Sequence, residues 1–228
     1  MSGLQTIIGK ASAIGVSRRK VVGIQISRNE IPRTSLTPTR NPWRFTIEMP
    51  ASLLYYTNRD LIEALDKLDR YSPQTITFNN TCLSWMFDYQ GAMTSGMISG
   101  LTVSTYTGNQ LTLTGLTAAG VTNGTVMFKP GDLIQIGTLP HPVTSVNTVT
   151  ATGANTITFE VNRPNFLGTV ASLAITVGSA CQFRVFCPNM PTYRLTPGGY
   201  VANGSTVLNN GLIEFSNEFE LYEWVGIS

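Results

Sequence analysis

Alternation of apolar and polar residues with a period of two dominates this chain of 228 residues. In residues 43–49 every second residue is apolar, whereas Arg44, Thr46 and Glu48 would face the opposite side. This pattern predicts a strand with one buried face. Weaker or shorter patterns predict further strands at 21–27, 74–78, 84–89, 98–103, 172–177, 181–186 and 213–225. The chain is therefore expected to be mainly β, within the α+β class.

One segment, residues 57–70, has a helical period instead. Its apolar residues would form one stripe along a helix: Leu61, Ile62, Ala64, Leu65 and Leu68. Thr57 and Asn58 are rival caps at the start, and the Pro73 that follows would stop the helix. The sequence predicts one amphipathic helix that lies on a sheet.

Residues 105–165 differ in composition from the rest of the chain, because they are rich in Thr, Gly and Asn and contain only short apolar pairs. Pro130 and Gly131 fit the central positions of a type II turn. Several short strands separated by turns indicate a small barrel or sandwich. We therefore expect a first domain formed by residues 1–104 and 166–228, with a small β domain inserted at 105–165.

Charge is scarce and unevenly distributed. Only 12% of the residues are charged and the net charge is +2, yet residues 1–44 hold eight basic residues and one acid. The last fifteen residues hold four acids and no base. Residues 28–42 contain three prolines, which cannot donate to a ladder, so this segment is expected to be a long loop or an extended arm. A loop of this length in a compact domain is usually functional.

The residues needed for catalysis or metal binding do not converge in the sequence. The single histidine, His141, stands between two prolines and is expected to be a surface histidine in a turn. Cys181, Cys187 and one histidine do not supply the three or four ligands of a zinc site, and no phosphate loop or dinucleotide fingerprint is present. With Cys82, the cysteines are expected to be reduced thiols of a protein made in a cytoplasm. We expect no enzyme activity, no cofactor and no metal.

The charged segments are the best candidates for an interaction surface. The basic residues lack a nucleic-acid-binding motif and interleaved aromatic residues, so a protein partner is favoured over nucleic acid. The acidic residues near the C-terminus could bind calcium or a basic partner, but the solvated face of the final strand is the preferred interpretation. The candidate interface residues are Arg18, Arg19, Lys20, Arg28, Arg33, Arg40, Glu214, Glu218 and Glu220.

The order of these features is informative as a whole. A basic β segment, a long loop with prolines, a strong strand at 41–49, a helix ending at 65–71 and a strand at 74–78 follow one another. This order resembles that of tail-tube-like ring proteins of tailed bacteriophages, especially distal tail and baseplate ring proteins. Residues 128–136 and 159–164 also resemble a segment that is common in phage tail proteins.

The resemblance implies a β-sandwich flanked by a helix and assembled as a hexameric ring. Such rings stack on the tail tube and carry the hub or baseplate, and DNA only passes through their lumen. The loop at 28–42 would reach a neighbouring subunit or ring. The implied function is that of a structural virion protein of the tail, assembled in the host cytoplasm without membrane insertion. A carbohydrate- or receptor-binding β module and a capsid decoration protein are the alternatives.

Overall fold

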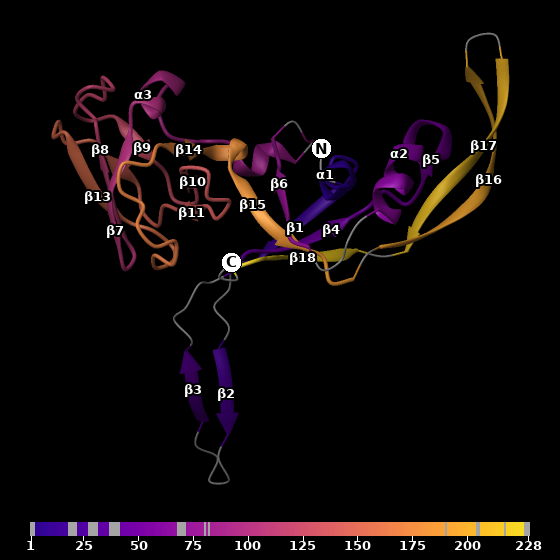
Figure 1. The fold of residues 1–228 in the computed structure, drawn as a ribbon, viewed down its shortest axis with the longest axis horizontal. Coiled ribbons are helices and arrows are strands. Elements are labelled where there is room, and N and C mark those ends of the chain that lie inside the picture. The colour runs from indigo at the N-terminus through magenta and orange to yellow at the C-terminus, as the bar shows by residue number, and fades with distance from the viewer. Residues whose placement is uncertain are drawn as a thin grey trace.

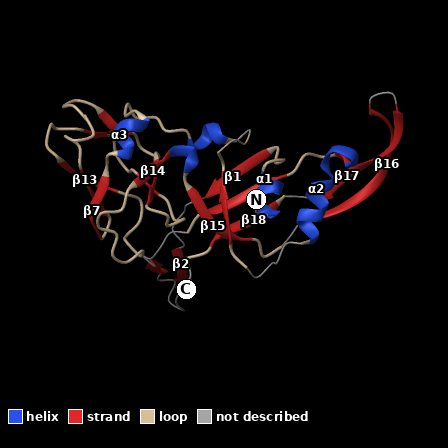
Figure 2. Cartoon of the chain, turned by 45° about the horizontal axis from the view of Figure 1, so that its top comes forward, coloured by secondary structure: helices blue, strands red, loops and turns tan. Residues whose placement is uncertain are grey.

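The computed structural model describes residues 3–17, 22–26, 32–36, 42–67, 72–79, 81, 83–189, 191–203, 206–216 and 218–225. Strands predominate over short helices among these residues (Figures 1 and 2), which confirms the prediction of a mainly β chain of the α+β class. The buried apolar residues form two separate clusters. We call them the first core and the inserted core.

A five-stranded antiparallel sheet supports the first core. Its strands, in spatial order, are β1 (Ala13–Ser17), β4 (Arg44–Glu48), β18 (Phe219–Glu223), β15 (Gln182–Phe186) and β6 (Gln74–Thr77). The predicted alternation is confirmed, because Trp43, Phe45, Ile47 and Met49 are buried and the residues between them are not. The buried face of the sheet is rich in aromatic rings, and Phe45 and Phe183 pack edge to face with ring centroids 5.0 Å apart.

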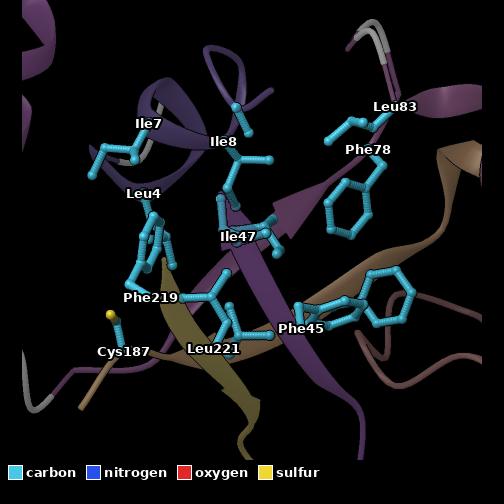
Figure 3. Packing of buried hydrophobic residues seen from close by; sticks show 14 of the residues in the cluster. Leu4, Ile7, Ile8, Phe45, Ile47, Phe78, Leu83, Cys187, Phe219 and Leu221 are labelled. Atoms are coloured by element: carbon cyan, nitrogen blue, oxygen red, sulfur yellow. The ribbon is translucent and has the colours of Figure 1, made fainter. Parts of the chain in front are cut away.

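A short helix, α1 (Gly3–Ile8), covers one part of this core. Leu4, Ile7 and Ile8 are buried, and Figure 3 shows them on the same side of the sheet as Ile47. The Gln5 side chain binds the backbone of Thr77 like a neighbouring strand: its Nε2 donates to the Thr77 carbonyl, and the Thr77 N–H donates to its Oε1, both over 2.8 Å. The outer edge of β6 is therefore capped by a side chain.

The predicted amphipathic helix is α2 (Tyr55–Asp66), and its stripe of Leu61, Ile62 and Leu65 is buried as expected. Leu68 lies outside the described residues. The helix begins before the expected caps. Asn58 instead lies inside it at a kink (φ −131°, ψ 23°), and its Nδ2 donates to the carbonyl of Leu54 over 2.9 Å.

A long hairpin extends beyond the five-stranded sheet (Figure 1). It consists of β16 (Thr192–Asn203) and β17 (Thr206–Ser216), and β5 (Leu53–Leu54) pairs with the other side of β17. The prediction of one final strand over 213–225 is therefore wrong. Its first part ends β17 in one sheet, and its second part is β18 in another.

The inserted core is surrounded by three small sheets. They are formed by β7 (Thr102–Thr107), β8 (Gln110–Thr114) and β13 (Thr156–Glu160); by β10 (Leu133–Ile136), β11 (Val143–Thr144) and β14 (Ile175–Val177); and by β9 (Val126–Phe128) and β12 (Val149–Thr150). A short helix, α3 (Ser95–Ser99), precedes β7. The predicted turn is confirmed: Gly131 has φ +95°, and the Asp132 N–H donates to the Lys129 carbonyl over 3.0 Å. Within residues 83–189, which are all described, no sheet closes into a barrel.

The boundaries predicted for the insertion, 105 and 165, are too narrow. Met93, Leu101 and Val103 belong to the inserted core, and so do Val170 and Ile175. The composition changes near residue 165, but the inserted core continues beyond it. Strand β14 pairs with β10 about 10 residues later and completes the inserted part. The inserted part corresponds to residues 88–177, between the 3-10 turns η1 (Ser84–Phe87) and η2 (Gly178–Ala180). The predicted strand at 84–89 is wrong, since η1 occupies most of it. Whether the inserted part folds by itself stays a prediction.

The predicted arm at 28–42 is partly wrong as well. Strands β2 (Val22–Ile26) and β3 (Pro32–Leu36) pair as an antiparallel hairpin, which Figure 1 shows projecting away from the sheets. Pro32 is the first residue of its strand, where a missing N–H is tolerated. The proline therefore marks the start of a strand rather than the interior of a loop.

Candidate functional site

The predicted basic surface falls largely outside the described residues. This holds for Arg18, Arg19, Lys20, Arg28 and Arg40. Arg33 lies in β3, paired with Gln25 of β2. An interface role for these six residues therefore stays a prediction.

The predicted acidic face is not one surface. Glu214 lies in β17, Glu218 precedes β18 and Glu220 lies in β18, so the chain passes from one sheet to another between them. Glu214 receives a hydrogen bond from Arg194 Nε over 2.5 Å and one from Thr196 Oγ1 over 3.0 Å. These hydrogen bonds, that of Arg194 above all, lower the pKa of Glu214.

Glu220 is paired in the same way on the solvent side of the five-stranded sheet. It accepts hydrogen bonds from the Tyr222 hydroxyl and from the Arg44 guanidinium, and these lower its pKa. The Arg44 guanidinium also lies over the Tyr222 ring, 5.3 Å from the ring centre. Glu214 and Glu220 are therefore neutralised within the chain at two separate places.

The last acid, Glu223, is the centre of a buried polar cluster that the sequence did not reveal. Its Oε2 accepts hydrogen bonds from the Trp43 N–H (3.0 Å) and from Arg163 Nη1 (2.7 Å). Its Oε1 lies 3.0 Å from Arg163 Nη2 and 2.9 Å from His141 Nδ1. The side chains of Glu223 and Arg163 are both 0% exposed. Four donors thus surround one carboxylate.

Arg163 has few alternatives to this carboxylate. Its Nη2 also donates to the Pro142 carbonyl over 2.8 Å, and its guanidinium lies 4.7 Å from the centre of the Phe166 ring. Its Nε is buried and has no hydrogen-bond partner among the described residues. Trp43 Nε1 donates to the same Pro142 carbonyl over 3.0 Å. The positive charge of Arg163 is balanced by Glu223.

The environment of Glu223 has two opposite effects on its ionisation. Burial raises the pKa of the carboxyl group, but the hydrogen bond from His141 and the charge and hydrogen bonds of Arg163 outweigh burial. The pKa of Glu223 therefore lies below its ordinary value, and the group is a carboxylate at neutral pH. The prediction of a surface histidine is wrong, because the His141 side chain is 12% exposed and held by this carboxylate.

The cluster holds the chain in place and is poorly suited to catalysis. Both oxygens of Glu223 are already occupied by donors, so the carboxylate has no position left from which to take a proton from a substrate. In the part of the chain that the structure describes, no three His, Cys, Asp or Glu side chains lie close enough together to hold a metal ion.

The two described cysteines are core residues. The Cys181 and Cys187 thiols donate to the carbonyls of Thr176 and Asn189 over 3.3 and 3.2 Å. Burial raises the pKa of Cys181 to about 12, which keeps the thiol protonated and unreactive. Cys82 lies outside the described residues.

Exposed apolar side chains gather at the base of the long hairpin. Leu195 of β16 is 55% exposed, Leu54 of β5 is 41% exposed and Tyr56 is 44% exposed. Two surface hollows adjoin the same region and share Ala51 and Phe215 in their lining. Leu195 pairs with Ile213 and Leu54 pairs with Leu212, so these two leucines lie on opposite faces of the sheet.

Comparisons with known proteins add no relative. No protein-family model matches the sequence, and a search of curated proteins finds no match. Among the described residues, no helix has the length and apolar character required to cross a membrane.

Proposed function

We propose that the chain is a structural ring subunit of a bacteriophage tail, placed at its distal end between the tail tube and the hub or baseplate. The observation that carries this proposal is the long hairpin β16–β17. It extends from the body, exposes Leu195, and ends its sheet with β16 as an edge strand. An unpaired edge and exposed apolar side chains are liabilities for a monomer and are ordinary features of a subunit interface.

The charged groups support the same proposal. Three arginines are paired with glutamates within the chain, as Arg44–Glu220, Arg163–Glu223 and Arg194–Glu214, and the donors around the buried Glu223 carboxylate leave no position for a substrate. A ring contact is heterologous, so a projecting element of one subunit meets a different surface of the next. The long hairpin and the β2–β3 hairpin are the two projecting elements of this chain.

A carbohydrate-binding module is less well supported. Sugar sites present exposed aromatic rings, and this reading would place the site in the inserted part. Tyr106, Phe128 and Phe159 are all buried there. Since these rings belong to the inserted core, they are not available to stack on a sugar.

The test compares two exposed positions in assembly. Leu195→Glu puts a charge on the proposed interface, whereas Val146→Glu puts one at another exposed apolar position, in the inserted part, where Val146 is 41% exposed. Negative-stain images of the purified wild type and of Val146→Glu should show rings, and Leu195→Glu should show mostly single chains with an unchanged circular dichroism spectrum. Rings of equal yield in both variants would show that the hairpin base is not the interface.

A further inference from the structure

The chain crosses between its two cores at one narrow place. The outgoing crossing follows η1, the returning one is η2, and the two turns lie against each other. Gly178 has φ +74°, and a Cβ there would lie 3.0 Å from the Tyr89 nitrogen and 3.3 Å from the Phe87 carbonyl oxygen. We call this pair of crossings the neck. Because both crossings share it, the neck alone would permit the inserted core to rotate relative to the first core.

A second connection lies at Glu223. The carboxylate belongs to the last strand of the five-stranded sheet, and Trp43 directly precedes β4 of the same sheet. His141 and Arg163, in contrast, belong to the inserted part. The cluster therefore joins the two cores through a fully buried ion pair.

Neutral contacts accompany the ion pair. The Gln182 N–H donates to Gln135 Oε1 over 2.6 Å, and the Arg184 N–H donates to the Pro140 carbonyl over 2.9 Å. Leu133, at the start of β10, is buried in the first core. These contacts all connect β15 and its surroundings with residues 133–140, so they would form or separate together with the cluster.

We propose that the Arg163–Glu223 pair is a latch, which holds the inserted core in one orientation and whose loss allows it to move about the neck. The physical reason is the cost of an unpaired buried charge. Besides Glu223, the partners of the Arg163 guanidinium among the described residues are a carbonyl group and an aromatic ring. The guanidinium can recover hydration only if the interface opens.

Glu223→Gln removes the charge and keeps the shape, and Glu220→Gln makes the same change at the exposed pair on the same strand. Mass spectrometry measures the hydrogen-exchange rates of backbone amides in both variants, and the full chain is used in whatever assembly it forms. In Glu223→Gln, exchange should accelerate on the order of 100-fold at the interface amides of Trp43, Gln182 and Arg184. The ladders β1–β4 and β8–β13, one in each core, should keep their wild-type exchange. Glu220→Gln should leave all of these amides unchanged.

Two results would overturn the latch. One is wild-type exchange at Gln182 and Arg184 in Glu223→Gln, and the other is equal loss of protection at the interface and in both ladders. If Glu223→Gln does not fold, the wild type supplies the test when it is titrated from pH 7 into acid. The interface amides, corrected for intrinsic exchange, should then lose protection before either ladder does. The charged and titratable groups that face Glu223 are Arg163 and His141, both from the inserted part. Simultaneous loss at the interface and in both ladders would contradict the proposal.

Discussion

The strand β18 carries two glutamates on opposite faces, and each is neutralised by an arginine. Glu220 lies on the solvent side with Arg44, whose side chain is 49% exposed. Glu223 lies on the core side with Arg163, where neither side chain is exposed. The chemistry of the two pairs is the same, so the difference between them is due to their surroundings.

Exposure to water determines how much each ion pair contributes to stability. The charges of an exposed pair are hydrated whether or not they meet, and salt screens their attraction. Such a pair therefore adds little to stability. A buried pair has lost its hydration, so each charge depends on the other. The buried pair therefore fixes the position of the chain, whereas the exposed pair only balances the charge of the sheet.

Removal of one buried charge should have the largest effect on stability. Arg163→Met leaves the Glu223 carboxylate without its cation and should lower the free energy of unfolding by about 3–5 kcal/mol. Denaturant unfolding measures this value, with Arg44→Met as the matched change at the exposed pair. The double variant Arg163→Met/Glu223→Leu should regain most of the loss, because no buried charge remains. Equal effects of Arg163→Met and Arg44→Met would remove the contrast between the two faces.

The same contrast between a buried and an exposed face holds on α2. Leu65 is buried in the first core, and Leu65→Ala should lower the free energy of unfolding by about 2–5 kcal/mol. Asp66, the next residue, is exposed and accepts a hydrogen bond of 3.4 Å from the Tyr193 hydroxyl. Asp66→Ala should have a far smaller effect in the same thermal or denaturant unfolding experiment. Similar losses would show that the helix packs by another face.

Acid should weaken the buried pair in a defined direction. The folded state lowers the pKa of Glu223 below the ordinary 4.5, so its contribution is complete above that value and disappears as the pH falls through the lower folded pKa. In Arg163→Met the pKa of Glu223 should rise, because burial is then opposed by fewer favourable contacts. Free energies of unfolding between pH 7 and pH 3 should therefore show a smaller acid-induced loss in the variant than in the wild type, because the folded and unfolded pKa values of Glu223 lie closer together. Superimposable profiles would mean that Arg163 does not control this ionisation.

The smallest effect is expected at the exposed pair. Glu220→Gln removes a charge that is open to solvent, and its effect on unfolding should be near the limit of detection. Addition of 1 M salt should remove what is left, because the Debye length falls to about 3 Å. The stability of the Glu223 cluster, in contrast, should persist in salt. A large, salt-resistant effect of Glu220→Gln would be inconsistent with the assignment of the two faces.

Periodic patterns of apolar residues were sufficient to predict single strands and the helix. The alternation from Trp43 to Met49 and the stripe of Leu61 and Leu65 each follow from one period and one buried face. The segment 84–89 shows the limit, because Phe87 is buried from a 3-10 turn rather than from a strand. A short apolar run predicts that its residues are buried, but it does not predict their backbone conformation equally well.

The buried cluster was missed although part of its signal is present. Glu223 continues the buried register of Phe219 and Leu221, and Arg163 continues that of Phe159 and Val161. Each therefore occupies a position where an apolar residue is expected. The identity of the partner could not follow from this, since the two residues are 60 positions apart and meet only through the packing of the two cores.

The number of chains in the particle that the purified protein forms shows whether this chain is a ring subunit. Native mass spectrometry of the full chain counts them without a partner protein. The proposed function predicts a dominant particle of six chains, which Leu195→Glu converts to single chains. A wild type that remains a single chain at every concentration, with both hydrophobic cores intact by hydrogen exchange, would contradict it.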